Sequence, residues 1–275
     1  MNKVSLSGYL FIQSGILDKN QVETSILNSI VYLQESYPKI NFSKDMLVNV
    51  VTNKEGKKFG HTYVWLKDIA VFNALLGKNF DGSTRFEYKE DENWNPPEKS
   101  YDEAMAETDD WAEWDDIERS YKRPKIKIPL EPLVTLPAIK YTEEQLKEIE
   151  NKSLFGFLEL NPVKITPKPD KINTLFSNDI PSWVTEEILF DFFSRFETDN
   201  IVHQDKKKKK KFQYPVVKIK QRKAAFDERR FCTIEFSTKE RQTALFLINV
   251  VKRTEILDGN KKALMFFSQS KSHGY

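Results

Sequence analysis

The sequence predicts an α+β fold in two domains of the same kind, one near each end of the chain. Strand and helix signals alternate in the order βαββαβ near the N-terminus, and the same order returns near the C-terminus. An acidic, proline-containing segment separates the two. At 275 residues the chain is long enough for two domains of ordinary size and a linker. We expect domains at 1–88 and 172–270, with the linker at 89–171.

Local signals place the elements of the N-terminal domain. Asp18, followed three residues later by Gln21, predicts an N-cap and a capping box for a helix at 19–36. Such an order of elements suits a four-stranded antiparallel sheet with two helices on one face and the other face open, as in ferredoxin-like sandwiches. The strands are predicted near 4–6, 46–51, 59–66 and 84–88, and a second helix at 67–76.

The C-terminal domain repeats this order. Thr185 is the predicted N-cap of a helix that runs to about residue 196. The other predicted elements are strands at 174–176, 214–220, 231–236 and 263–267, and a helix at 239–253. The sequence therefore predicts that one fold is used twice.

The segment between the domains differs in composition. Residues 87–118 hold fourteen Asp or Glu and two Lys, so the rest of the chain is basic although the totals are 43 basic and 41 acidic residues. So polar a stretch buries too little apolar surface to fold alone. A short helix is expected near 143–152, with Thr142 as its cap. Three tryptophans in the acidic part are candidate partner-binding residues: Trp94, Trp111 and Trp114.

Several functional classes receive no support from the sequence. The single cysteine, Cys232, and three scattered histidines offer no disulfide and no metal-ligand spacing. His61 has no neighbouring carboxylate or nucleophile pattern, so we expect no enzyme, cofactor or small-molecule substrate. No apolar run has the length of a membrane span. The expected location is intracellular, in cytoplasm or nucleus.

The third predicted strand of the N-terminal domain carries four ring-bearing side chains. Strand alternation places Phe59, His61, Tyr63 and Trp65 on one face. The helices cover only one face of such a sheet, and Val64 and Leu66 already supply that face with apolar side chains. We therefore expect the rings to lie on the open face.

These strands resemble the motifs of the RNA-recognition-motif (RRM) family. The segment Phe59-Gly60-His61-Thr62-Tyr63-Val64-Trp65-Leu66 resembles the aromatic octapeptide of the third strand. The segment Val4-Ser5-Leu6-Ser7-Gly8-Tyr9 is similar to the first-strand motif, with Ser5 where the family has a stacking aromatic. In the C-terminal domain, Arg229-Arg230-Phe231-Cys232-Thr233-Ile234-Glu235-Phe236 resembles the octapeptide, and Phe176 would stack beside Phe231. The resemblance covers roughly 1–88 and 172–270.

The resemblance implies non-catalytic binding of single-stranded RNA, as in mRNA metabolism. Bases would stack on the rings, and lysines and arginines would neutralise the phosphates. The expected RNA-binding residues are Ser5, Lys58, Phe59, His61, Tyr63, Trp65, Arg85, Phe176, Lys206, Lys208, Lys210, Arg229, Phe231 and Phe266.

Other interpretations stay open at this point. The protein is alternatively an adaptor in which the rings and the Trp-bearing linker contact a partner protein. The lysine run at 206–211 is a phosphate contact, an import signal or a solvated loop. The acidic segment is a solvated linker, a docking segment for a partner protein, or a polyanion that competes with RNA for a basic domain face.

Overall fold

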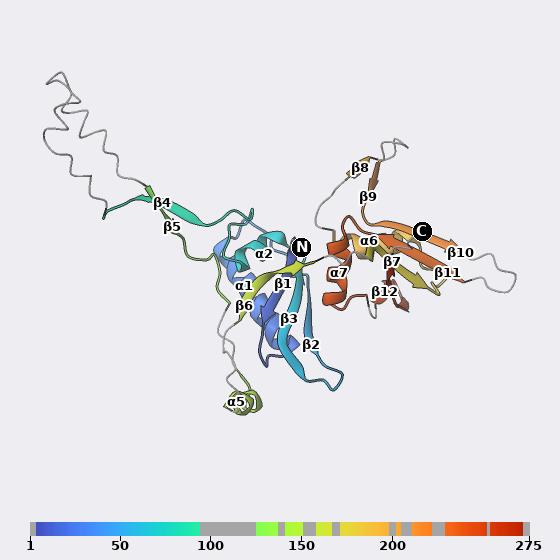
Figure 1. The fold of residues 1–275 in the computed structure, drawn as a ribbon, viewed down its shortest axis with the longest axis horizontal. Helices are drawn as coiled ribbons and strands as arrows, with labels where there is room; N and C mark the ends of the chain where they lie inside the picture. The colour runs from blue at the N-terminus through green and yellow to red at the C-terminus, as the bar shows by residue number, and fades with distance from the viewer. Residues whose placement is uncertain are drawn as a thin grey trace, which may run out of the picture.

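The N-terminal domain is built on a four-stranded antiparallel sheet in the order β2-β3-β1-β6 (Figure 1). Its strands are β1 (Val4–Gln13), β2 (Met46–Thr52), β3 (Lys58–Leu66) and β6 (Glu159–Ile165). The computed structural model describes residues 4–93, 125–136, 141–150, 158–166, 171–197, 202–204, 211–221, 229–251 and 254–271.

Two helices cover one face of this sheet, α1 (Lys19–Ser36) and α2 (Ile69–Leu75). The predicted capping box is present: the Asp18 carboxylate accepts from the Gln21 backbone N–H, and the Gln21 side chain accepts from the Asp18 N–H. The core between helices and sheet includes Leu10, Ile12, Val22, Ile26, Ile30, Val64, Leu66 and Val71. Local capping and periodicity therefore set the first helix as the sequence predicts.

The fourth strand of the N-terminal sheet is not the one that the sequence predicted. The segment expected at 84–88 forms β4 (Phe86–Glu90), which pairs with β5 (Lys125–Pro129) in a separate two-stranded ribbon. The fourth position is taken by β6, from the expected linker, paired with β1. Pro162 lies in β6, which is an edge strand, and proline is tolerated there because an edge strand needs no hydrogen bond on its outer side. The sheet therefore extends well beyond residue 88.

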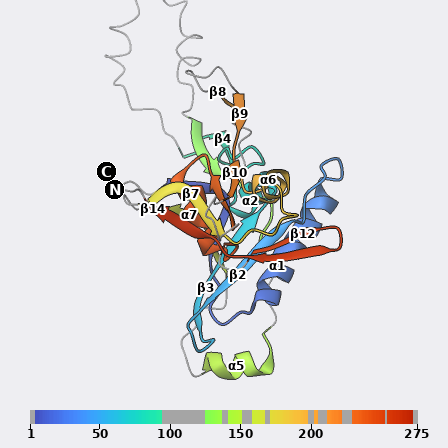
Figure 2. The same cartoon turned by 90° about the vertical axis from the view of Figure 1, so that its right-hand side faces the viewer.

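Other parts of the expected linker also pack on the N-terminal domain. Val134 is buried in its core. The helix α5 (Glu143–Glu150) has the predicted cap, because the Gln145 backbone N–H donates to Thr142 Oγ1. Gln145 Nε2 donates to the Gln21 side chain at 2.6 Å, which holds α5 near the start of α1. In both views α5 lies at the same end of the domain as the β2–β3 turn (Figures 1 and 2).

The C-terminal domain has a second four-stranded antiparallel sheet, in the order β10-β11-β7-β14. Its strands are β7 (Lys171–Asn178), β10 (Val216–Gln221), β11 (Arg230–Glu235) and β14 (Ser268–Lys271). The helices are α6 (Glu186–Ser194), which begins at the predicted cap Thr185, and α7 (Lys239–Leu247). A short hairpin, β8 (Val202–Gln204) with β9 (Lys211–Gln213), precedes β10. Both sheets are four-stranded and antiparallel, as the α+β sandwich predicted from the sequence requires.

The end of the C-terminal domain differs from the prediction in two ways. The helix expected to reach residue 253 ends at Leu247, and Asn249 turns the backbone with a φ of 61°. The strand expected at 263–267 is largely β13 (Lys261–Met265), which forms a hairpin with β12 (Thr254–Asp258). The strand that joins the sheet is β14, so Phe266 precedes the fourth strand instead of lying on it.

The two domains share one hydrophobic core. Leu6, Tyr9 and Trp65 of the N-terminal sheet belong to the same buried cluster as α6, α7 and the C-terminal sheet. In Figure 1, α7 lies between the two sheets. The layers therefore run helix, sheet, helix, sheet, and the helices of the C-terminal domain cover part of the N-terminal sheet face that was expected to be open.

Candidate nucleic-acid interface

Four rings lie side by side on the N-terminal sheet, and we call them the N-terminal ring row: Phe11, Phe59, His61 and Tyr63. The Phe11 centroid lies 5.5 Å from that of His61 and 5.6 Å from that of Tyr63. The Phe59 and His61 centroids are 6.3 Å apart. Phe59 is 61% exposed and the other three are partly buried, so the row is most open at its Phe59 end.

Phe11 is a member of the row that the sequence prediction missed. The first-strand motif was aligned on residues 4–9, which put Ser5 at the stacking position. In the structure Phe11 pairs with Tyr63, whereas Ser5 lies opposite Lys164, away from the rings. The register of β1 against β6 shifts between Ser5 and Leu10, where Gly8 has a φ of 83°, and such a bulge re-aims the residues after it.

Trp65 is not available to a base, contrary to the prediction. Its side chain is 2% exposed, and its ring centroid lies 4.8 Å from that of Phe196, at the end of α6. Tyr9, its partner across the strands, is fully buried. Asn49 of β2 also donates a hydrogen bond to the Leu247 carbonyl oxygen of α7. The C-terminal domain thus covers the N-terminal sheet at Trp65 and leaves the Phe59 end of the N-terminal ring row exposed to solvent.

A buried ion pair stands beside this contact. Arg241 Nε lies 3.1 Å from the Glu197 carboxylate, and the side chains are 7% and 3% exposed. Glu197 also accepts from the Ser237 backbone N–H at 2.8 Å and from the Ser237 hydroxyl at 2.7 Å. Arg241 donates to the Phe196 carbonyl oxygen at 3.0 Å. The pair therefore joins α7 to the end of α6 beneath the interdomain core.

Burial raises the pKa of Tyr9 far above its ordinary value of 10.0; the Arg241 charge opposes this rise and the Glu197 charge adds to it. The Tyr9 hydroxyl has no hydrogen-bond partner within the part of the chain that the structure describes. Because the unfolded tyrosine ionises near pH 10 and the folded one does not, stability should fall above that pH by about 1.4 kcal/mol per pH unit. Tyr9→Phe should remove this loss and leave stability at pH 7 unchanged or higher, because an unpaired buried hydroxyl is costly.

Urea midpoints at pH 7 and above pH 10 measure this difference. Tyr32→Phe is the control, because Tyr32 is 55% exposed and its removal should leave the alkaline loss unchanged. Equal alkaline losses in Tyr9→Phe and the wild type would contradict the assignment to Tyr9.

The C-terminal sheet presents a second set of rings on the face away from its helices. Phe176 of β7 and Phe231 of β11 lie with centroids 5.8 Å apart. Their neighbours Leu175 and Cys232 point the other way into the core, and burial raises the pKa of the Cys232 thiol to about 12. No described helix covers the face that carries the two phenylalanines (Figure 1).

Two lysines of β10 share this face. Lys220 pairs with Phe231, and Lys218 pairs with Thr233, which in turn pairs with Phe176. Directly paired residues project to the same side of a sheet, and both lysines are exposed. We call Phe176, Phe231, Lys218 and Lys220 the C-terminal ring face. The sequence prediction named the phenylalanines and missed these lysines, although their alternation with Val217 and Ile219 was a usable signal.

The other cations predicted to bind RNA either make contacts within the protein or lie outside the described residues. Lys58 donates to the Ile16 carbonyl oxygen at 2.6 Å. Arg85 donates to the Glu131 carbonyl oxygen and to Asn79 Oδ1, at the base of the β4–β5 ribbon. Arg229 lies 3.8 Å from the Asp179 carboxylate, at the end of the C-terminal ring face. Lys206, Lys208, Lys210, Trp94, Trp111 and Trp114 are outside the described residues.

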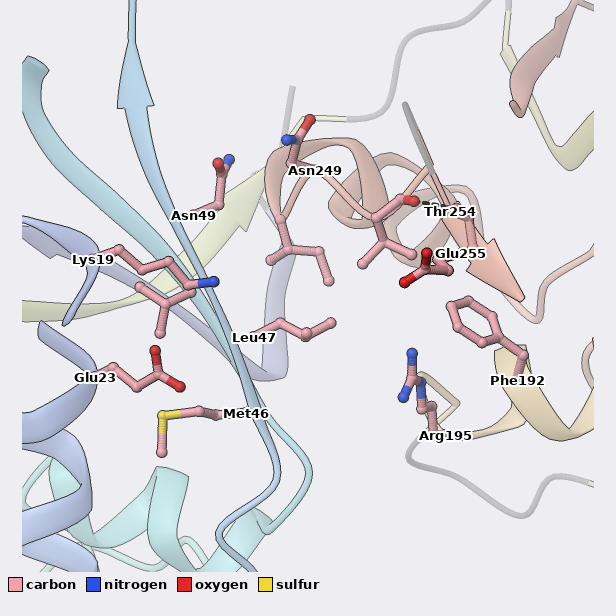
Figure 3. Close-up of a pocket in the computed structure, with 13 residues that line it drawn as sticks. Lys19, Glu23, Met46, Leu47, Asn49, Phe192, Arg195, Asn249, Thr254 and Glu255 are labelled. Atoms are coloured by element: carbon pink, nitrogen blue, oxygen red, sulfur yellow. Dashed lines mark hydrogen bonds between the residues drawn. The ribbon is translucent and has the colours of Figure 1, made fainter. Parts of the chain in front are cut away.

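A groove of about 340 Å³ runs between β2 and the C-terminal domain (Figure 3). Lys19 and Glu23 line one side, and Arg195 and Glu255 line the other. The Arg195 guanidinium lies 4.2 Å from the Phe192 ring centroid. Because both signs of charge line the groove, it favours no single class of charged ligand.

Metal and membrane sites receive no support from the described part of the chain. Within those ranges no cluster of His, Cys, Asp or Glu could hold a metal ion. None of the described helices has the length and apolar character needed to cross a bilayer.

Comparisons with known proteins add little to this geometry. No protein-family model matches the sequence, and no curated protein matches it. Among solved structures the chain is similar to one described as "SXL-LETHAL PROTEIN/RNA COMPLEX", at 11% identity over 96% of this chain and 100% of that chain, with a TM-score of 0.23. A likeness at that TM-score carries no argument. What the structure itself shows is an α+β fold with two antiparallel four-stranded sheets.

Proposed function

We propose that this protein binds single-stranded RNA, without catalysis, through base stacking on two separate ring surfaces. The observation that carries the proposal is the C-terminal ring face: two neighbouring rings on the central strands of a sheet face that no described helix covers, with two exposed lysines beside them. Stacking on an aromatic ring contributes about 1 to 3 kcal/mol per base and tolerates many sequences. The lysines supply attraction to phosphates that weakens as salt rises.

The N-terminal ring row adds a second, smaller surface. Because the C-terminal domain covers Trp65 and Tyr9, bases would reach Phe59 and His61 first, and Tyr63 and Phe11 only in part. The shared core fixes the two surfaces on one body, so a single strand that reaches both gains from the high effective concentration of the second site.

The double variant Phe176→Ala plus Phe231→Ala should bind single-stranded RNA at least about fivefold more weakly, since a base stacked on a ring is worth about 1 kcal/mol or more. Titration of a labelled single-stranded RNA, with circular dichroism to check the fold, measures the effect. Leu257→Ala is a matched control, because Leu257 is 63% exposed on the β12–β13 hairpin. His61→Ala plus Tyr63→Ala tests the N-terminal ring row in the same assay. If both double variants bind as the wild type does, the proposal is wrong.

The alternative is a protein-interaction adaptor. One observation favours it: the rings at the Trp65 end of the N-terminal sheet already contact protein, namely the helices of the C-terminal domain. An adaptor would show no affinity for RNA in the wild type. Its partner protein would bind more weakly to the double variants, unless the partner contacts other surfaces.

A further inference from the structure

The β4–β5 ribbon extends from the N-terminal domain away from the C-terminal domain (Figure 1). Its strands pair with each other and with no other described strand. At the base of the ribbon, Arg85 Nε donates to the Glu131 carbonyl oxygen, and the Leu130 N–H donates to the Arg85 carbonyl oxygen at 3.2 Å. An isolated pair of strands adds little stability of its own. Stability therefore does not account for the exposed aromatic and charged residues along the ribbon.

The two faces of the ribbon differ in chemistry. Tyr88 pairs with Lys127, and Phe86 lies two residues before Tyr88, so the three share one face. The Phe86 and Tyr88 rings meet edge to face with centroids 5.1 Å apart, and Lys127 Nζ lies 3.6 Å from the Phe86 centroid. The opposite face carries Ile126 and Ile128 together with a Lys89–Glu87 ion pair. One face therefore carries two rings and two lysines, with the single carboxylate of Glu90 opposite Lys125, whereas the other is aliphatic with one Lys–Glu pair.

The aromatic face offers a ring for base stacking and ammonium groups for phosphates, the two contacts by which proteins bind single-stranded nucleic acid. The Tyr88 side chain is 61% exposed and is held on one side by Phe86, so a base can stack on it with little loss of side-chain freedom. Lys127 is already held over the neighbouring ring, and Lys125 lies on the same face further out, opposite Glu90. Phosphates that follow a base stacked on Tyr88 would meet these ammonium groups.

We propose that the face of the β4–β5 ribbon formed by Phe86, Tyr88, Lys125 and Lys127 is a third binding surface for single-stranded RNA. The proposal rests on the proposed function, because it assigns the ribbon to the same ligand class. In Figure 1 the ribbon and the C-terminal domain lie on opposite sides of the N-terminal domain, so this surface and the C-terminal ring face can act on one molecule only when that RNA is long.

The test compares Tyr88→Ala with Ile126→Ala in the full chain, on a long single-stranded RNA of mixed sequence. Ile126 is 41% exposed on the opposite face, so it matches the loss of an exposed apolar side chain without touching the rings. Tyr88→Ala should lose about fivefold or more in affinity, the value of one stacked base, and Ile126→Ala should bind as the wild type does. Equal losses in both variants would mean a structural role for the ribbon and would overturn the proposal.

A salt series supplies a second, independent readout. The slope of log affinity against log salt should shrink by about 0.7 for each phosphate of a single strand that the protein no longer neutralises. Lys127→Ala should shrink it, and Lys89→Ala, on the opposite face, should not. If Tyr88→Ala and Lys127→Ala bind as the wild type does while Phe176→Ala plus Phe231→Ala binds weakly, the ribbon proposal fails and the proposed function stands. If the wild type binds no RNA, both fail.

Discussion

Trp65→Ala should destabilise the whole chain by about 3 to 5 kcal/mol, the usual cost of removing a large buried aromatic side chain. Trp65 belongs to the N-terminal sheet, but its ring packs against Phe196 within the core that contains α6 and α7. The cavity would therefore open between the domains and weaken both. Urea unfolding followed by circular dichroism should show one transition in the wild type, displaced to lower urea in the variant.

Two comparisons make this prediction specific. Phe59→Ala removes a ring from the same strand, but Phe59 is 61% exposed, so it should cost well under the Trp65 value. Trp65→Phe should cost less than Trp65→Ala, because its ring fills much of the cavity and the indole N–H that is lost has no hydrogen-bond partner among the described residues. Two separate unfolding transitions, with only one displaced by Trp65→Ala, would show that the domains are independent and would contradict the shared core.

The elements that the sequence predicted correctly are set by neighbours in the chain. The capping box of α1 and the cap of α6 involve residues three positions apart, so they can be identified without knowledge of the fold. The alternation that placed Phe59, His61 and Tyr63 on one face is equally local. Such signals predict which residues form an element and which face they share.

The fourth strands were not predictable in the same way, because a strand signal does not name its partner. The apolar and aromatic residues at 84–88 indicate a strand, and a strand forms there, but it pairs with β5. Pro162 is unfavourable within a strand and is tolerated in β6 because β6 lies at the sheet edge. Similarly, β14 is short and polar and gives a weaker signal than β13, although β14 is the strand that joins the sheet.

The covering of Trp65 depends on packing between domains, but α7 did carry a signal for it. Apolar residues 244–247 follow one another without interruption, so the last turn of α7 is apolar on all sides. A helix that is apolar on all sides is buried on all sides. Here one side packs on the C-terminal sheet and another on the N-terminal sheet. That composition indicated a second packing surface for α7, although it did not say which part of the chain would meet it.

The ion pair beneath the interdomain core leads to the second large expected effect. Glu197→Ala leaves the Arg241 guanidinium buried without its carboxylate, and breaking a buried pair in this way costs about 3 to 5 kcal/mol. It also leaves the Ser237 N–H and hydroxyl without their acceptor. Lys67→Ala is the control, because the Lys67–Asp45 pair is exposed and such pairs contribute about 0 to 1 kcal/mol.

The double variant Glu197→Leu plus Arg241→Leu distinguishes the effect of an unbalanced buried charge from the effect of the lost hydrogen bonds. We expect most of the loss in Glu197→Ala to come from breaking the buried Arg241–Glu197 charge pair, so removing both charges should recover much of the stability. Chemical denaturation of these variants and the wild type at pH 7 gives the comparison. A double variant as unstable as Glu197→Ala would mean that the hydrogen bonds to Ser237 and to the Phe196 carbonyl oxygen, and not the balance of charge, hold the end of α6 against α7.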